Sequence, residues 1–215
     1  MNKLAECGCS GPQKTFDGMS KRYKRILWIV IAINAAMFFV EMAAGQLSGS
    51  QALQADALDF LGDATTYGIS LAAIGASVAV RTNAALFKAF TLFAMGLWVM
   101  AATVWKVFVV GVPEAHIMGV IGFLALVANL TSVLLLMKYK DGDANVRSVW
   151  LCSRNDAIGN VAVMIAALGV WGTATGWPDL AVAGIMGTLF LNSAYLIVKQ
   201  ALGEKRSAQS HELPQ

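Results

Sequence analysis

The sequence predicts an all-α membrane protein with six transmembrane helices and both termini in the cytoplasm. The 215 residues are 57% hydrophobic and only 13% charged, whereas soluble domains carry roughly 25% charged residues. The mean hydropathy is +0.62. The charges crowd into short intervals, and the apolar stretches between them reach roughly 20 residues, the length that a helix needs to cross the hydrocarbon core of a bilayer.

Six apolar stretches are long enough, and we expect each to form a helix. They cover approximately residues 26–44, 52–78, 84–110, 116–137, 149–171 and 180–198. A transmembrane barrel is disfavoured because its strands would alternate between polar and apolar residues, and these runs do not. We therefore expect a flexible cytoplasmic tail at 1–25, a six-helix membrane domain at 26–202 and a short cytoplasmic tail at 203–215.

The basic residues predict the orientation. Of the sixteen Lys and Arg, all but two lie before the first helix, after the last, or beside the even-numbered connections. The exceptions are Lys106, near an odd-numbered connection, and Arg154, within the fifth helix. The positive-inside rule then places both termini in the cytoplasm. We expect the protein to be a multi-pass protein of the inner (cytoplasmic) membrane. The net charge of +3 is explained by this topology, and no nucleic-acid partner is expected because no basic patch is interleaved with aromatics.

Three aspartates interrupt the second apolar stretch. Asp56, Asp59 and Asp63 have the spacing i, i+3 and i+7, so they share one face of a helix. Near the centre of a bilayer each would cost about 2.5–3.5 kcal/mol on insertion scales. Carboxylates kept in a membrane at this cost indicate a functional site.

A second polar stripe lies on the fifth helix, where Cys152, Asp156 and Asn160 recur every four residues. Two pairs of ligands four residues apart on facing helices supply four side chains, the number that a tetrahedral ion needs. The expected metal ligands are Asp59, Asp63, Cys152 and Asp156. Each binds metal only when deprotonated, so a site loaded from the cytoplasm and protonated from outside would exchange metal for protons.

Four further polar residues are candidates for supporting or gating this site: Glu41, Asp56, Arg154 and Asn160. The alternative is a purely structural role, in which the acids pair with Arg154 and with polar neighbours. One arginine cannot, however, neutralise four aspartates. Arg154 points about 200° around the helix from Asp156. We expect it either to pair with Asp56 or Glu41 or to reach the cytoplasmic edge of the membrane.

The N-terminal tail contains Cys7-Gly8-Cys9. Two thiolates one residue apart can chelate a soft ion such as Cu(I), Zn²⁺ or Cd²⁺. Metal capture by Cys7 and Cys9 is one interpretation, and two unstructured thiols without a role is the other.

Taken together, these residues resemble the cation diffusion facilitator family, six-helix exporters of divalent transition metals driven by proton exchange. The resemblance covers about residues 25–202. The matching pieces are Asn34, Glu41 and Gly45, the run 48–57, Asn129, the run 145–147, Asp156-Ala157 and Pro178-Asp179. The family places two transport ligands on helix two and two on helix five, which correspond to Asp59, Asp63, Cys152 and Asp156 in this sequence.

Two departures from the family pattern bear on selectivity and assembly. The family usually has His or Asp at the position of Cys152, whose thiolate favours Zn²⁺ or Cd²⁺, whereas three carboxylates favour a harder ion such as Mn²⁺. The tail cysteines favour the thiophilic ions. Typical members also continue into a cytoplasmic metal-binding dimerisation domain, so we expect a short form of the family, with a homodimer formed through the third helix or another face.

The resemblance implies a secondary active metal/proton antiporter, not an enzyme, that exports Zn²⁺ or Cd²⁺, with Mn²⁺, Co²⁺ and Fe²⁺ as further candidates. No cofactor is expected beyond the transported ion, and the expected partners are the metal, protons, the lipid bilayer and a second copy of the chain. A membrane-bound metal sensor or accessory subunit and a passive channel remain as alternatives. An intramembrane aspartyl protease with Asp63 and Asp156 as its dyad is disfavoured, because the Gly-x-Gly-Asp motif of that family is absent from the sequence.

Overall fold

The computed structural model describes residues 20–72, 78–109, 111–139 and 144–211. These residues form six α-helices and one short 3₁₀ helix: α1 (Lys21–Ser48), α2 (Gln51–Ala72), α3 (Val78–Phe108), α4 (Ala115–Leu136), η2 (Met137–Tyr139), α5 (Ala144–Thr173) and α6 (Trp177–His211). Five of the helices are long and apolar enough to cross a membrane. The all-helical prediction is therefore confirmed for the described residues, and the exception among the six helices is α2, whose three aspartates interrupt its apolar run.

The helix boundaries differ from the prediction at one internal position. The apolar run 52–78 was expected to be a single helix, but α2 ends at Ala72 and Val78 already belongs to α3. Hydropathy could not locate this break, because residues 64–80 contain neither a charge nor a proline. At the C-terminal side, α6 continues as a helix to His211, beyond the expected limit of the membrane domain.

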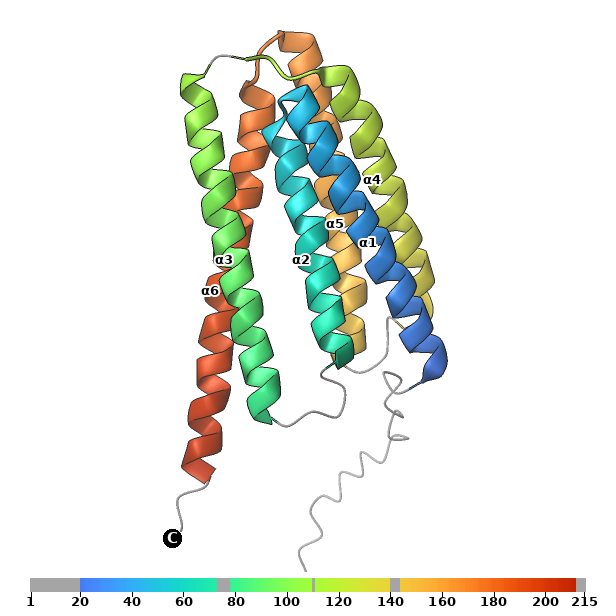
Figure 1. Ribbon diagram of the computed structural model, residues 1–215, viewed down its shortest axis with the longest axis vertical. Helices are drawn as coiled ribbons and strands as arrows, with labels where there is room; N and C mark the ends of the chain where they lie inside the picture. The colour runs from blue at the N-terminus through green and yellow to red at the C-terminus, as the bar shows by residue number, and fades with distance from the viewer. Residues whose placement is uncertain (1–19, 73–77, 110, 140–143, 212–215) are drawn as a thin grey trace, which may run out of the picture.

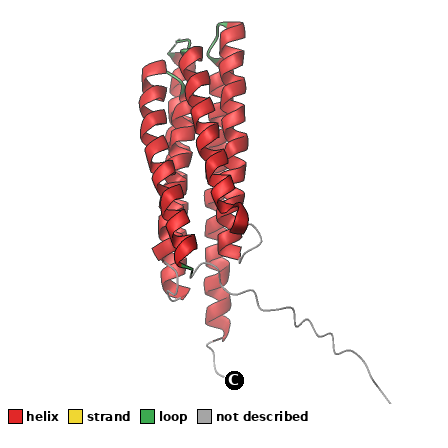
Figure 2. Ribbon diagram, turned by 90° about the vertical axis from the view of Figure 1, so that its right-hand side faces the viewer, coloured by secondary structure: helices red, strands yellow, loops and turns green. Residues whose placement is uncertain are grey.

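The helices lie side by side along the long axis of the molecule (Figure 1, Figure 2). The connections from α1 to α2, α3 to α4 and α5 to α6 all lie at one end, which we call the Ser50 end after the residue between α1 and α2. Helix α3 packs mainly along α6, while α1 packs on α2 and α4 packs on α5 and α1. Helix α2 is the one that contacts α1, α3, α5 and α6, so its side chains lie in the interior.

The close contact between α3 and α6 depends on two glycines. A Cβ atom added to Gly96 would lie 2.8 Å from the Cγ atom of Leu191, and one added to Gly187 would lie 3.0 Å from the sulfur of Met100. Small residues let helices approach closely in membranes, where the packing of side chains drives association. Gly96 and Gly187 therefore set the distance between these two helices.

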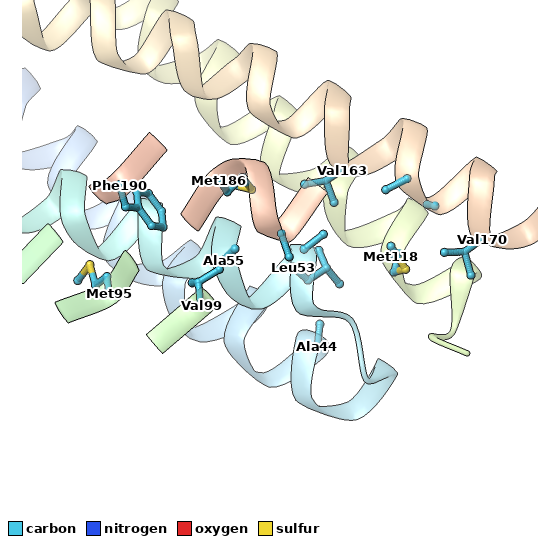
Figure 3. Close-up of a cluster of buried hydrophobic side chains, with 14 of the residues drawn as sticks. Ala44, Leu53, Ala55, Met95, Val99, Met118, Val163, Val170, Met186 and Phe190 are labelled. Atoms are coloured by element: carbon cyan, nitrogen blue, oxygen red, sulfur yellow. The ribbon is translucent and has the colours of Figure 1, made fainter. Parts of the chain in front are cut away.

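The largest apolar core lies in the half of the bundle toward the Ser50 end (Figure 3). It combines side chains from all six helices, including Leu53 and Ala55 of α2, Val99 of α3, Val163 of α5 and Met186 of α6. The opposite, outward faces carry large exposed apolar side chains, among them the aromatic residues of α3: Phe87, Phe90, Phe93, Trp98, Trp105 and Phe108. Such outward faces suit contact with lipid.

The first residues of α2 are capped by a residue of α6. The carboxylate of Asp179, which is 1% exposed, accepts from the Ser50 hydroxyl at 2.6 Å, the Gln51 amide at 2.8 Å and the Ala52 amide at 3.0 Å. The first backbone amides of a helix have no hydrogen-bond acceptor within that helix. A carboxylate at the N-terminus of a helix also interacts favourably with the helix dipole. Asp179 therefore fixes the start of α2, and with it the height of the aspartates that follow.

The turn before α2 is held from the other side. Gly49 ends α1 with φ of 72°, a left-handed conformation that glycine adopts without strain, and its carbonyl accepts from the Lys106 ammonium at 3.1 Å. Lys106 extends from the last turn of α3. The Ser50 end of α2 is thus tied to both α3 and α6.

Candidate metal-binding site

The three aspartates of α2 lie along the interior of the bundle, as their spacing predicts. Asp56 is almost fully buried, at 1% exposed, whereas Asp59 and Asp63 are partly buried. Asp59 interacts electrostatically with both Asp56 and Asp63. The helix can hold three carboxylates on one face because its remaining faces are rich in Leu, Ala and Gly, which pack against its neighbours.

The carboxylate of Asp156 on α5 lies within hydrogen-bonding reach of both Asp59 and Asp63. The structure thus places Asp156 of α5 opposite Asp59 and Asp63 of the antiparallel helix α2. Cys152 lies in α5, one turn before Asp156, but its side chain is outside the described part of the structure. Among the described residues, no three His, Cys, Asp or Glu side chains are already arranged as a metal-binding group, so the four-ligand site stays a prediction.

Tyr67, which the sequence analysis did not single out, contacts this carboxylate cluster, and Ser153 lies beside Tyr67. The buried Tyr67 hydroxyl donates a hydrogen bond to Asp63 and lies 3.4 Å from the hydroxyl oxygen of Ser153, which is also buried. Tyr67 therefore connects α2 to α5 beside Asp63. Its position four residues after Asp63 continues the stripe of the three aspartates, and this spacing was a signal available in the sequence.

Among the described residues, one basic side chain acts on this carboxylate cluster. The charge of Lys88, on α3, interacts with both Asp59 and Asp63. In the sequence analysis, Lys88 was counted only among the basic residues beside the even-numbered connections. In the described part of the structure, Lys88 is the basic residue whose positive charge acts on the proposed ligands.

Arg154 does not act as a counter-ion for the buried acids. Its side chain is exposed, its guanidinium carbon lies 5.5 Å from the ring centroid of Trp150, and its Nη2 atom donates to the Asn155 side chain at 3.3 Å. The expected pairing with Asp56 or Glu41 is therefore not formed, because Arg154 lies on the outward face of α5 while both acids face the interior.

The other polar candidates lie in the interior. Glu41 of α1 is 0% exposed and lies within hydrogen-bonding reach of Asp56, and Asn160 of α5 is also 0% exposed. Asn34 is a satisfied packing residue, since its side-chain amide donates to the Val30 carbonyl at 2.8 Å. Cys7 and Cys9 lie outside the described residues.

The fold and the cluster define a polytopic helical membrane protein whose interior holds converging carboxylates. Residues 27–204 match the model of the cation efflux transmembrane domain, and the chain belongs to this family. The resemblance to the cation diffusion facilitators is thereby confirmed.

Three relatives illustrate the range of similarity. The metal cation efflux system protein CzcD of Cupriavidus metallidurans is 27% identical over 193 residues, which cover 83% of this chain and 60% of CzcD. The zinc transporter ZitB of Yersinia pestis is 30% identical over 212 residues, covering 92% of this chain and 66% of that protein. The ZitB of Escherichia coli is 28% identical over 197 residues, covering 84% and 62%. The chain therefore spans about three fifths of the length of the curated relatives it matches.

Proposed function

We propose that this protein exports a divalent transition-metal cation from the cytoplasm in exchange for protons, through a site between α2 and α5. The observation that carries the proposal is the interaction of Asp156 of α5 with Asp59 and with Asp63 of α2 inside a membrane bundle. Three carboxylates together in a region of low dielectric repel one another, and a divalent cation relieves this repulsion. The names of the relatives, a metal cation efflux protein and zinc transporters, support the same class of cargo.

The chemistry of the ligands accounts for the exchange. A carboxylate or thiolate binds metal only after losing its proton, so metal and protons compete for the same atoms. When the site opens toward the proton-rich side of the membrane, protonation of the ligands releases the ion. When it opens toward the cytoplasm, metal displaces the protons. The basic residues support an orientation in which the Ser50 end faces away from the cytoplasm.

Cys152 completes the proposed ligand set and governs its preference. One thiolate beside three carboxylates favours Zn²⁺ and Cd²⁺ over Mn²⁺, because softer ions gain more from sulfur. The ion is the cargo of the protein and not a cofactor. A homodimer within the membrane is part of the proposal, formed through the exposed apolar face of α3 or through another face of the bundle.

Metal flux into proteoliposomes tests the proposal. The full chain is reconstituted with an internal fluorescent chelator, and uptake of Zn²⁺, Cd²⁺, Mn²⁺ and Co²⁺ is followed with and without a pH gradient. The variants are Asp63→Asn and Asp156→Asn, and the matched control is Glu114→Gln, which changes an exposed acid in the connection before α4. We expect gradient-driven flux in the wild type and the control, and its loss in both site variants.

The outcome separates the alternatives. Flux that persists in Asp63→Asn and Asp156→Asn would reject the site, and conductance that is indifferent to the pH gradient would indicate a channel. Metal binding without flux of any ion would indicate a sensor or accessory subunit. For the ion preference, Cys152→Asp should raise the flux of Mn²⁺ relative to Cd²⁺, and an unchanged ratio would remove the thiolate from the ligand set.

A further inference from the structure

Glu41 and Asp56 form a buried pair of acids that the proposed transport site does not use. Glu41 extends from the face of α1 that packs on α2, and the two carboxylates lie within hydrogen-bonding reach of each other. Neither oxygen of Glu41 has a hydrogen-bond partner, nor does Oδ2 of Asp56. Two acids buried in contact are unfavourable unless something positive lies between them.

Asn160 adds a third unpartnered side chain to the same level of the bundle. It is 0% exposed, and neither its amide nitrogen nor its amide oxygen has a partner. It lies one turn beyond Asp156 toward the Ser50 end, or about 6 Å. Asp56 lies three residues from Asp59 in the same direction, or about 4.5 Å, because α2 and α5 run antiparallel.

The neighbouring core supports this placement of Asn160 beside Asp56. Ala55, the residue before Asp56, and Val163, one turn after Asn160, belong to the same cluster of buried side chains, to which all six helices contribute (Figure 3). Asn160 shares the interior face of α5 with Val163 and with Asp156. Asn160 therefore lies on the interior face of α5, at the level of Asp56.

We propose that Glu41, Asp56 and Asn160 form a second binding position for the divalent cation, between the transport site and the Ser50 end. The inference rests on the proposed function, because the ion that occupies this position is the one that has left the transport site. A single shared proton would satisfy one oxygen of each acid and leave the remaining oxygens and the amide without partners. A divalent cation is coordinated by several oxygens at once.

The ligand types give this position a distinct task. It offers only oxygen atoms, whereas the transport site adds the Cys152 thiolate in the proposed scheme. A Zn²⁺ or Cd²⁺ ion is held less strongly without sulfur. Transport requires sites that bind well enough to admit an ion and weakly enough to let it leave. The oxygen-only position is suited to the departure of the ion.

Equilibrium binding of ¹⁰⁹Cd²⁺ to the purified full chain tests the inference, with Cys7→Ser and Cys9→Ser in every variant so that the tail does not contribute. Three proteins are compared with this background: Asp63→Asn with Asp156→Asn, Glu41→Gln with Asp56→Asn, and all four changes together. We expect the background protein to bind a second ion, with an affinity at least about tenfold below that of the first. Each pair of changes should remove one of the two ions, and the four changes should remove both.

The inference and the proposed function can fail separately. If Glu41→Gln with Asp56→Asn leaves the second ion in place, the second position is rejected. If Asp63→Asn with Asp156→Asn leaves the tighter ion in place, the transport site is rejected. An infrared band of a protonated carboxyl group that persists at saturating Cd²⁺ and disappears in Glu41→Gln would assign a shared proton to the pair, and would overturn the metal assignment.

A variant that adds a ligand guards against a failure to fold. Asn160→Asp is nearly isosteric and gives the position a third carboxylate. We expect it to bind the second ion at least about tenfold more tightly, since affinity rises with the charge of the ligand set. The matched change is Asn155→Asp, on the exposed face of the same helix, which should leave the second affinity unchanged. Equal affinities in Asn160→Asp and the background would reject the inference.

Discussion

Replacing Asp179 should destabilise the bundle more than replacing any exposed acid. Its buried carboxylate accepts three hydrogen bonds, from the Ser50 hydroxyl and from the amides of Gln51 and Ala52. A hydrogen bond to a charged group is worth about 1.5–3 kcal/mol, and a buried donor left without a partner costs about 1–3 kcal/mol. Because the three bonds share one acceptor group, their contributions do not add fully. We expect Asp179→Ala to lower the free energy of unfolding by about 3–5 kcal/mol.

Asp179→Asn should cost less, about 1–2 kcal/mol, since its amide oxygen can still accept while its NH₂ group faces a donor. Both values can be measured by unfolding in mixed micelles with tryptophan fluorescence as the probe. Glu114→Gln serves as the control, because Glu114 is exposed. A loss below about 0.5 kcal/mol in Asp179→Ala, comparable to a surface substitution, would refute the argument that this cap holds α2.

Three further changes test other contacts. Gly96→Val should destabilise the fold by about 1–3 kcal/mol, since a side chain there would lie closer to Leu191 than van der Waals contact allows. Thermal unfolding in detergent measures this loss, and an unchanged midpoint would contradict the close packing. Tyr67→Phe removes the hydroxyl that donates to Asp63, and we expect about tenfold weaker metal binding at the proposed site with little loss of stability; equal affinity in titrations would remove Tyr67 from the site. Gly49→Ala places a side chain at φ of 72° and should lower the free energy of unfolding by about 1 kcal/mol. An unchanged stability in the same unfolding assay would contradict this expectation.

The membrane helices followed from the sequence because hydropathy and charge spacing report directly on the solvent around each segment. The same signal could not divide the apolar run after Asp63, where α2 ends at Ala72 and α3 begins at Val78. That run contains no charge or proline that would mark the boundary between the two helices. Hydropathy also cannot distinguish α2 as an interior helix from a span in contact with lipid.

For the candidate site, periodicity was sufficient to align Asp59 and Asp63 and to assign Asp156 to a facing helix. Periodicity describes one helix at a time, however, and could not reveal that Glu41 meets Asp56 across α1 and α2. The cap on α2 was similarly hidden, because Asp179 lies 128 residues from Gln51 in the sequence. Contacts between distant segments depend on the rotation and height of each helix, which the sequence pattern leaves open.

The cap on α2 also has a consequence for how the chain is made. Helix α2 carries three aspartates and is outside the group of five described helices that are apolar enough to cross a membrane. The residue that satisfies its first amides, Asp179, belongs to α6, which leaves the ribosome more than a hundred residues later. A nascent chain that ends before α6 therefore lacks the partner that fixes α2. The cap on the helix that holds the acidic site can therefore form only when synthesis of the membrane domain is nearly complete.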